Sequence, residues 1–513
     1  MQGLIESTQV FRWQKLRLHI APEGLLLETR SPLSESGEVE GFAAYENIAA
    51  ALVEKRGRRA TLVIDFHDAT EPPWLLPNLP PAEAEWAADL IQRHIQAAER
   101  ISDPMFTEPL PLAEVGTQAL TLLGNQQEQL VDLVDFLLLQ AIFHGASDVH
   151  LEPFREEVRV RYRINGMLHE VVQLPKHLHG PLLTRLKVVS KLSVFRHDLP
   201  QEGRMIARTG GRSVDLRVSS LPTIHGEKVV IRIFDPDRGL FNLDELGFSP
   251  QMQAEFERLL AMPQGVILLT GPSNSGKTTT LYAALRHLHA TNKSLSSIVT
   301  VEDPVEYDLQ VINQTQVNLA AGLTFARGLR TVLRQDPEVI MIGEIRDGET
   351  AEIAVRAGLT GHLILSTVHA RSAPGVFVRL LDLGVEPFLV ASAVNAVLAQ
   401  RLVRTVCLDC AEPDTPGPEL LRKFGLREAS EGQFLRGTGC NTCHGTGYAG
   451  RTGIFELLRV SDWLRELIMH KVPLGELEQL VAQQGLSTLA DDGLAKAKAG
   501  VTTLEEVARV LGL

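Results

Sequence analysis

Residues 271–278 have the types and the spacing of a phosphate-binding loop, G-x-x-x-x-G-K-[ST]. Glycines at the ends of such a loop permit backbone angles that let successive N–H groups surround a phosphate. The lysine reaches the β- and γ-phosphates, and the following hydroxyl holds Mg²⁺. We therefore expect ATP with Mg²⁺ to bind a loop and helix start made of Gly271, Pro272, Ser273, Asn274, Ser275, Gly276, Lys277, Thr278 and Thr279.

A strand and a helix flank this loop, as phosphate binding requires. The apolar segment Gly265–Thr270 predicts a buried strand, and the segment 278–289 has helical composition with Leu281, Ala284 and Leu285 along one stripe. The loop would thus meet the positive end of a helix. The alternative is a chance match in a turn rich in glycine, serine and threonine, but that would not explain the flanking strand and helix.

Acidic residues follow two further apolar segments. Glu302 and Asp303 come after the predicted strand Ser297–Val301, and Glu344 comes after Val339–Gly343. In an open parallel sheet the carboxyl ends of the strands meet the ligand. We expect Glu302 or Asp303 to orient or deprotonate the attacking water, and Glu344 to act on Mg²⁺ through water. For the first pair, the alternative is a polar turn before a proline.

Histidine and arginine residues offer further contacts. The predicted strand His362–Thr367 leads to His369, a position from which a polar side chain can sense the γ-phosphate, although a structural role at a strand end is the alternative. Arg204 and Arg217 lie on predicted strands upstream of the loop. An arginine delivered to the γ-phosphate stabilises transition-state charge. Their spacing alone instead favours a solvated strand face.

All four cysteines of the chain form two C-x-x-C pairs, Cys407 with Cys410 and Cys440 with Cys443. Each pair can place two thiolates on one ion, and two pairs complete a tetrahedral zinc site. Disulfides and redox chemistry are the alternatives, but two pairs with no spare cysteine favour structural Zn²⁺. His444 is a less favoured ligand.

Composition narrows the class of protein. The 513 residues suggest about three domains. The net charge of −13 argues against a general nucleic-acid binder. We find no apolar run of about 18 residues and no secretory signal pattern, so we expect a cytoplasmic protein that contacts the membrane only through partners.

The expected fold class is α/β with several domains. In the N-terminal part, Ala60–Phe66 predicts a strand, and Phe42–Glu54 and Ala82–Glu99 predict helices. The prolines in Glu71–Pro81 predict an extended loop, either a docking segment or a rigid connector. Further on, short strands and the hairpin signal Asn165–Gly166 predict an antiparallel α+β domain. The predicted segments are an N-terminal docking domain (1–100), a linker (101–124), the α+β domain (125–236), an ATPase core (240–404), a tetracysteine subdomain (405–455) and a C-terminal helical domain (456–513).

The sequence from about residue 125 to residue 510 resembles the secretion ATPases of the type II secretion and type IV pilus assembly class. Four stretches carry this resemblance: the phosphate-binding loop 271–278, the segment 301–307 (VEDPVEY), the run 324–347 that ends in MIGEIRD, and the segment 361–369 (GHLILSTVH). Together these stretches are highly specific for the family.

The resemblance implies a RecA-like core preceded by a PAS-like domain, and a hexameric ring with nucleotide at the junction of the two domains. It also implies that Lys277 binds phosphate, that Glu302 acts on the water and that Glu344 supports Mg²⁺. Arg204 and Arg217 match positions that the family uses as phosphate contacts.

The four-cysteine element is similar to that of assembly ATPases and is typically absent from retraction ATPases. The resemblance therefore implies a motor that powers pseudopilus assembly in type II secretion, with type IV pilus assembly as the alternative. The implied partners are further copies of the chain and the cytoplasmic domains of inner-membrane platform proteins, with no nucleic acid. A nucleic-acid motor and a nucleotide-binding scaffold with negligible turnover are the rival classes.

Overall fold

The structure is a computed structural model of the chain, which divides into two compact units, Met1–Asp235 and Pro236–Leu513. Among the residues that the structure describes, none of the helices is long and apolar enough to cross a membrane. The finer division into six segments stays a prediction. The described residues are 9–13, 16–21, 24–29, 38–43, 48–57, 59–66, 73–99, 108–123, 129–209, 212–235, 241–291, 297–428 and 432–513.

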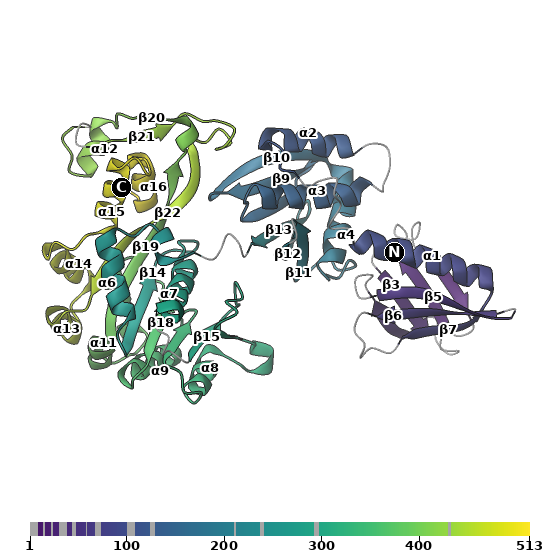
Figure 1. The fold of residues 1–513 in the computed structure, drawn as a ribbon, viewed down its shortest axis with the longest axis horizontal. Helices are drawn as coiled ribbons and strands as arrows, with labels where there is room; N and C mark the ends of the chain where they lie inside the picture. Colours follow the sequence, from purple (N-terminus) through teal and green to yellow (C-terminus); the bar gives the residue numbers. More distant parts are fainter. Residues whose placement is uncertain are drawn as a thin grey trace. The chain divides into compact units, whose positions relative to one another are not determined.

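The N-terminal part of the first unit contains a four-stranded and a three-stranded antiparallel sheet, in which every strand pairs with its neighbour in sequence. Ala84, Ala87 and Ile91 of the helix Pro81–Glu99 are buried in one core with Leu62 and Ile64 of the central strand of the three-stranded sheet. The elements, shown in Figure 1, are β1 (Gln9–Trp13), β2 (Leu16–Ala21), β3 (Gly24–Thr29), β4 (Glu38–Ala43), β5 (Ile48–Arg56), β6 (Arg59–Phe66), β7 (Trp74–Leu79) and α1 (Pro81–Glu99).

The predicted strand over Ala60–Phe66 and the predicted helix over Ala82–Glu99 are confirmed. The helix predicted over Phe42–Glu54 is wrong, because most of this segment forms β5. Burial there alternates, with Ala51 buried and Leu52 exposed, which is the period of a strand. An apolar run this short fits either period, and antiparallel pairing with β6 decides the outcome.

The prolines of Glu71–Pro81 had predicted a loop without regular structure. This prediction is wrong. Residues 74–79 form β7, and residues 71–72 lie outside the described part. Pro77 is tolerated because β7 is an edge strand, paired only with β6.

A six-stranded antiparallel sheet forms the second part of this unit, in the order β10-β9-β8-β13-β12-β11. The predicted hairpin at Asn165–Gly166 is confirmed, since Ile164 pairs with Met167 across it and both turn residues have positive φ. The elements are α3 (Gln129–Phe143), β8 (Asp148–Pro153), β9 (Glu157–Ile164), β10 (Met167–Pro175), α4 (His179–Val189), β11 (Gln201–Thr209), β12 (Arg212–Thr223) and β13 (Gly226–Phe234).

The predicted linker over 101–124 contains a helix, α2 (Leu112–Leu122). Its Val115 and Ala119 are buried in the core of the six-stranded sheet. A Cβ added to Gly116 would lie 2.2 Å from the carbonyl oxygen of Val171 on β10, so the helix packs closely on that strand. The α+β domain therefore begins before residue 125. Pro104, Pro109 and Pro111 are typical of a linker, but they do not show what the apolar residues after them contact.

The second unit is built on a seven-stranded sheet in the order β16-β15-β17-β18-β14-β19-β22. All pairs are parallel except β19 with β22. Two separate buried clusters, one with α6 and α7 and one with α8 to α11, show that helices cover both faces (Figure 1). The elements are α6 (Pro250–Leu260), β14 (Gly265–Thr270), α7 (Lys277–Thr291), β15 (Ile298–Glu302), β16 (Asn313–Gln316), α8 (Phe325–Val332), β17 (Val339–Ile342), α9 (Gly348–Leu359), β18 (Leu363–Thr367), α10 (Ala373–Asp382), α11 (Pro387–Ala393), β19 (Val394–Val406) and β22 (Tyr448–Arg459).

Strands β19 and β22 form a long antiparallel ribbon. One cysteine pair follows the end of β19 and the other precedes the start of β22, so both pairs lie at the same end of the ribbon. Between them lie β20 (Ala411–Pro413), α12 (Pro418–Lys423) and β21 (Leu435–Gly437). The segment predicted to be a C-terminal helical domain contains four helices, and Thr503 caps the last one by accepting the N–H of Glu506. These helices are α13 (Asp462–Met469), α14 (Leu474–Gln483), α15 (Leu489–Lys498) and α16 (Leu504–Leu511).

Replacing Gly358 by alanine should destabilise the second unit by about 1–3 kcal/mol. A Cβ at this position of α9 would lie 2.6 Å from Cγ2 of Val266 on β14. Thermal unfolding of the full chain measures the effect. Gly475→Ala in α14 is the matched control, because nothing lies within 4 Å of its added Cβ. Equal melting temperatures for the two variants would contradict this close helix–strand packing.

Candidate active site

The phosphate-binding loop connects the end of β14 to the start of α7, as its sequence predicts. Gly271 and Gly276 have φ values of 153° and 86°. A Cβ at Gly271 would lie 2.4 Å from the carbonyl oxygen of Gln400, and a Cβ at Gly276 would lie 2.8 Å from its side-chain nitrogen. Glycine is therefore required at both positions by the backbone angles and by the close approach of β19.

The loop offers the donors that a triphosphate requires. Helix α7 begins at Lys277, so its first N–H groups have no acceptor within the helix. The hydroxyl of Ser275 is buried and has no hydrogen-bond partner among the described residues. Nζ of Lys277 donates to the carbonyl oxygens of Gly271 and Pro272, at 2.9 and 2.8 Å. These residues fit a nucleoside triphosphate, whose oxygens would accept from the same groups.

Glu344 lies beside the lysine, as the sequence predicts for an acid at the end of a neighbouring strand. Burial lowers the pKa of Lys277, whereas the charge of Glu344 raises it. The Glu344 carboxylate accepts from Arg346 and lies 3.5 Å from Nε2 of His369. The fold thus brings together the lysine, the acid and the histidine from three separate motifs. An acid in this place fits a water-mediated contact to Mg²⁺ bound with the nucleotide.

Glu302 lies at the end of β15, but its side chain is only 3% exposed. Its oxygens accept from the hydroxyls of Tyr282 and Thr300, both at 2.5 Å, and from Nε2 of Gln314 at 3.0 Å. The carboxylate therefore joins β15 to α7 and β16. That it acts on the attacking water stays a prediction. The other acid named from the sequence, Asp303, is exposed.

Arg204 and Arg217 belong to the first unit, where they face each other on β11 and β12. Nε of Arg204 donates to Asp215 at 2.5 Å. The guanidinium of Arg217 lies 4.1 Å from the ring centroid of Phe234. Their predicted contact with phosphate stays a prediction, because it requires the other unit.

Gln400 was missed by the sequence analysis. It is 2% exposed, and its side-chain oxygen accepts from the hydroxyl of Thr280 in α7 at 2.9 Å. The interaction fixes α7 relative to β19 immediately behind the loop. The signal in the sequence is weak: an amide that directly follows the short apolar run Ala396–Ala399.

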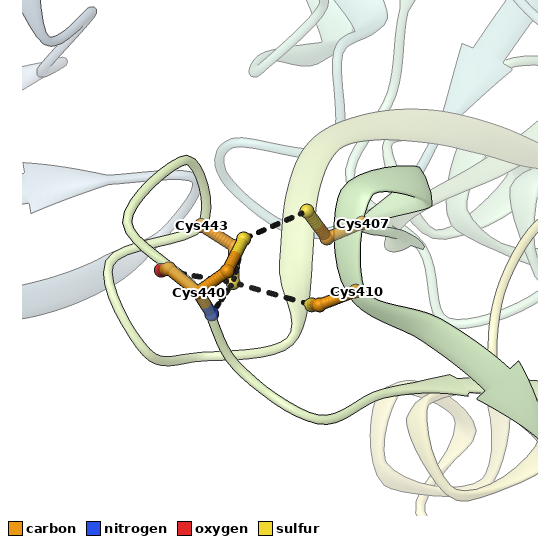
Figure 2. Close-up of side chains that lie close together, drawn as sticks. All are labelled: Cys407, Cys410, Cys440 and Cys443. Atoms are coloured by element: carbon orange, nitrogen blue, oxygen red, sulfur yellow. Dashed lines mark hydrogen bonds between the residues drawn. The ribbon is translucent and has the colours of Figure 1, made fainter.

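The four cysteines converge although 33 residues separate the two pairs (Figure 2). Cys407 and Cys410 face Cys440 and Cys443, with sulfur–sulfur distances of 3.7, 3.8 and 3.7 Å for the pairs 407–440, 410–443 and 440–443. A tetrahedral zinc ion with Zn–S distances of about 2.3 Å separates its sulfurs by about 3.8 Å. In the described part of the chain this metal-capable group contains no histidine, so His444 is not a member.

Backbone N–H groups support thiolates in this cluster. Gly439 donates to Cys410 Sγ at 3.3 Å, and Cys440 and Gly447 donate to Cys443 Sγ at 3.1 and 3.2 Å. Burial raises the pKa of Cys443, but these two N–H groups lower it, and the net pKa is about 6. The sulfur geometry and the donors fit a structural Zn²⁺ with four sulfur ligands, which leaves no open position for catalysis.

The loop, the neighbouring acid and the parallel sheet covered on both faces define a P-loop ATPase. The family described as "Type II/IV secretion system protein" matches residues 124–509. The type II secretion system ATPase E of Vibrio cholerae is 46% identical over 410 residues, which cover 80% of each chain. The type II secretion system protein E of Pseudomonas aeruginosa is 47% identical over 381 residues, covering 74% of this chain and 75% of the relative. The chain therefore belongs to the type II/IV secretion system protein family and is an ATPase of that family.

Solved structures support the fold. The Legionella pneumophila ATPase DotB superposes with a TM-score of 0.56 at 19% identity, over 74% of this chain and 95% of its own. The pilus retraction motor PilT superposes with a TM-score of 0.50 at 23% identity, over 73% of this chain and 95% of its own. At these identities the likeness concerns the fold alone, and it confirms the expected RecA-like core.

Lys277→Ala and Glu344→Gln should each lower the ATPase rate at least about 100-fold without unfolding the chain. The first removes the group that reaches the phosphates, and the second removes the charge beside it. Steady-state hydrolysis and thermal unfolding measure the two effects. Lys423→Ala, an exposed lysine of α12, is the control. Near-normal turnover in either site variant would contradict the assignment.

Reduced protein should contain about one zinc ion per chain. Removing it with a chelator should expose residues 405–455 to protease before the ATPase core is cut, because the metal organises this subdomain. Metal analysis and limited proteolysis followed by mass spectrometry test this. A matched variant with serine at Cys407 and Cys440 should lack the metal and be cleaved without chelator. Absence of zinc from reduced wild-type protein would contradict the assignment.

Proposed function

We propose that this protein is a hexameric ATPase that powers pseudopilus assembly in type II protein secretion across the outer membrane. The observation that carries the proposal is the identity of 46% to the Vibrio cholerae type II secretion system ATPase E over 80% of both chains. The family model matches residues 124–509, which include the nucleotide site, the cysteine cluster and the α+β domain, so the likeness concerns the motor as a whole.

In this proposal Lys277 and the loop bind the phosphates of ATP, and Glu344 supports Mg²⁺. Arg204 and Arg217 contact the phosphates when the α+β domain closes over the core. On the sheet of the α+β domain, Arg204 is exposed and Arg217 is half-buried, so both are accessible to an incoming ligand. Glu302 contributes to activation of the water. Hydrolysis then reopens the site, and staggered opening around the ring moves the partner.

The remaining roles follow from the same proposal. The four cysteines hold a structural Zn²⁺. The N-terminal domain docks on the cytoplasmic domains of inner-membrane platform proteins, which places the ring in the cytoplasm, peripheral to the inner membrane. The protein has no role on nucleic acid, consistent with its net charge of −13.

The alternative is that the protein powers type IV pilus assembly. ATP hydrolysis would be the same, but the ATPase would serve a different cellular assembly. Lys277→Ala, introduced in place of the wild-type chain in its own cells, should distinguish the two. In a secretion motor, exported proteins should accumulate in the periplasm while surface pili remain. The measurement is the extracellular fraction of secreted proteins, together with pilus counts by microscopy. The exposed-lysine variant Lys423→Ala should behave as wild type. Loss of pili with normal secretion would overturn the assignment to secretion and leave the ATPase chemistry in place.

A further inference from the structure

The segment 368–372 that follows β18 carries His369 to its place beside Glu344. Its first half is fixed to β14. The N–H of Val368 donates to the carbonyl oxygen of Leu269 at 2.9 Å. The Thr270 hydroxyl donates to the carbonyl oxygen of Ala370 and accepts its N–H, both at 3.0 Å. Thr270 is also the last residue of β14 before the phosphate-binding loop.

The second half of this segment has two side-chain contacts: the Ser372 hydroxyl donates to Glu478 at 2.5 Å, and Arg371 is bound by Arg401 on β19. Nη1 of Arg401 donates to the carbonyl oxygen of Gln400 at 2.9 Å, and its Nη2 donates to the carbonyl oxygen of Arg371 at 3.0 Å. The guanidinium therefore joins the strand that passes behind the phosphate-binding loop to the segment that carries the histidine. Two donors in a rigid fork are needed for this bridge, which a lysine cannot provide in full.

Arg401 interacts electrostatically with Lys277 in the nucleotide site and with Glu456 on β22. It lowers the pKa of Lys277, in addition to the larger effect of burial. The pKa of Arg401 is itself lowered by burial and raised by Glu456 on β22. Glu456 in turn accepts the N–H of Leu489 at the start of α15, at 3.4 Å. Arg401 thus lies between the nucleotide site and the C-terminal helices.

Arg371, which Arg401 holds, is two residues from His369, whose Nε2 lies 3.5 Å from the Glu344 carboxylate. We infer that Arg401 is a positioning residue for ATP hydrolysis, which holds segment 368–372 so that His369 stays beside Glu344. The inference rests on the ATPase activity and adds a residue outside the signature stretches. Arg401 acts through the segment, so its loss should alter the chemical step more than the binding of ATP.

Steady-state ATPase kinetics of the full chain test this inference with Arg401→Ala, Arg401→Lys, Thr270→Val and the double variant Thr270→Val/Arg401→Ala. Arg401→Ala should lower kcat about 10–100-fold, the scale expected for small misplacements at a reacting centre. KM for ATP should change less than about threefold, because ground-state binding is retained. Arg401→Lys should recover part of the lost kcat. Arg379→Ala, an exposed arginine on α10, should match wild type.

The double variant separates action through the segment from direct action on the phosphates. If Arg401 and Thr270 hold the same segment, the combined loss of kcat should be clearly smaller than the product of the single losses. Losses that multiply, or a raised KM with unchanged kcat in Arg401→Ala, would overturn the inference. So would wild-type kcat in folded Arg401→Ala, as judged by thermal unfolding. The kcat of the wild-type chain, measured in the same experiment, tests the ATPase assignment itself. The ratio of each variant's kcat to the wild-type kcat tests the role of Arg401.

Discussion

Strand β19 passes so close to the phosphate-binding loop that no side chain fits between them. Its parallel pairing with β14 ends at Thr270 opposite Ala399, so the next residue on each strand is Gly271 and Gln400. A Cβ on Gly271 would meet the Gln400 carbonyl oxygen at 2.4 Å. The glycine that lets the loop surround a phosphate is thus also the glycine that lets the sheet continue beyond it. The Gln400 side chain also accepts from the Thr280 hydroxyl, so β19 holds the first turn of α7 directly behind the loop.

The same strand connects the site to the rest of the second unit. Strand β19 runs from Val394 to Val406, past the end of β14, and the next residue is Cys407. Near that end Arg404 donates to the buried carboxylate of Glu506 in α16 at 2.5 Å. Burial raises the pKa of Glu506, but hydrogen bonds from Arg509 and Arg404 lower it below its ordinary value. One continuous strand therefore packs against the phosphate-binding loop, leads to the first cysteine of the cluster and carries an anchor for the last helix.

The two acids that end neighbouring strands have different surroundings, although their sequences look alike. Glu344 lies close to Lys277 and to His369, beside the phosphate-binding loop. Glu302 is buried with both oxygens engaged by protein donors. Such a network rigidifies the strand end from which Asp303 projects, because every member of it is satisfied. Apolar runs in the sequence predicted where the strands lie. The direction in which each carboxylate points depends on the side chains that pack beside it.

Local pattern in the sequence was sufficient to locate the groups of the candidate site. The loop, Glu344 and the cysteine pairs are short-range motifs, and the buried strands around them are apolar runs that form strands in any parallel sheet. The sequence was insufficient where an element depends on a distant neighbour. Residues 42–43 and 48–54 lie in strands and residues 74–79 pair with β6, because pairing overrode a weak local signal.

Tertiary structure alone decided the roles of Gln400 and Arg401. The partner of the Gln400 side chain is 120 residues away in the sequence, and Arg401 reaches a carbonyl oxygen 30 residues away. No spacing rule connects such positions, because the contacts exist only once β19 is placed beside β14. The sequence by itself determined the phosphate-binding loop and the acid Glu344 near it. The packing of the sheet decided which other residues hold those groups in place.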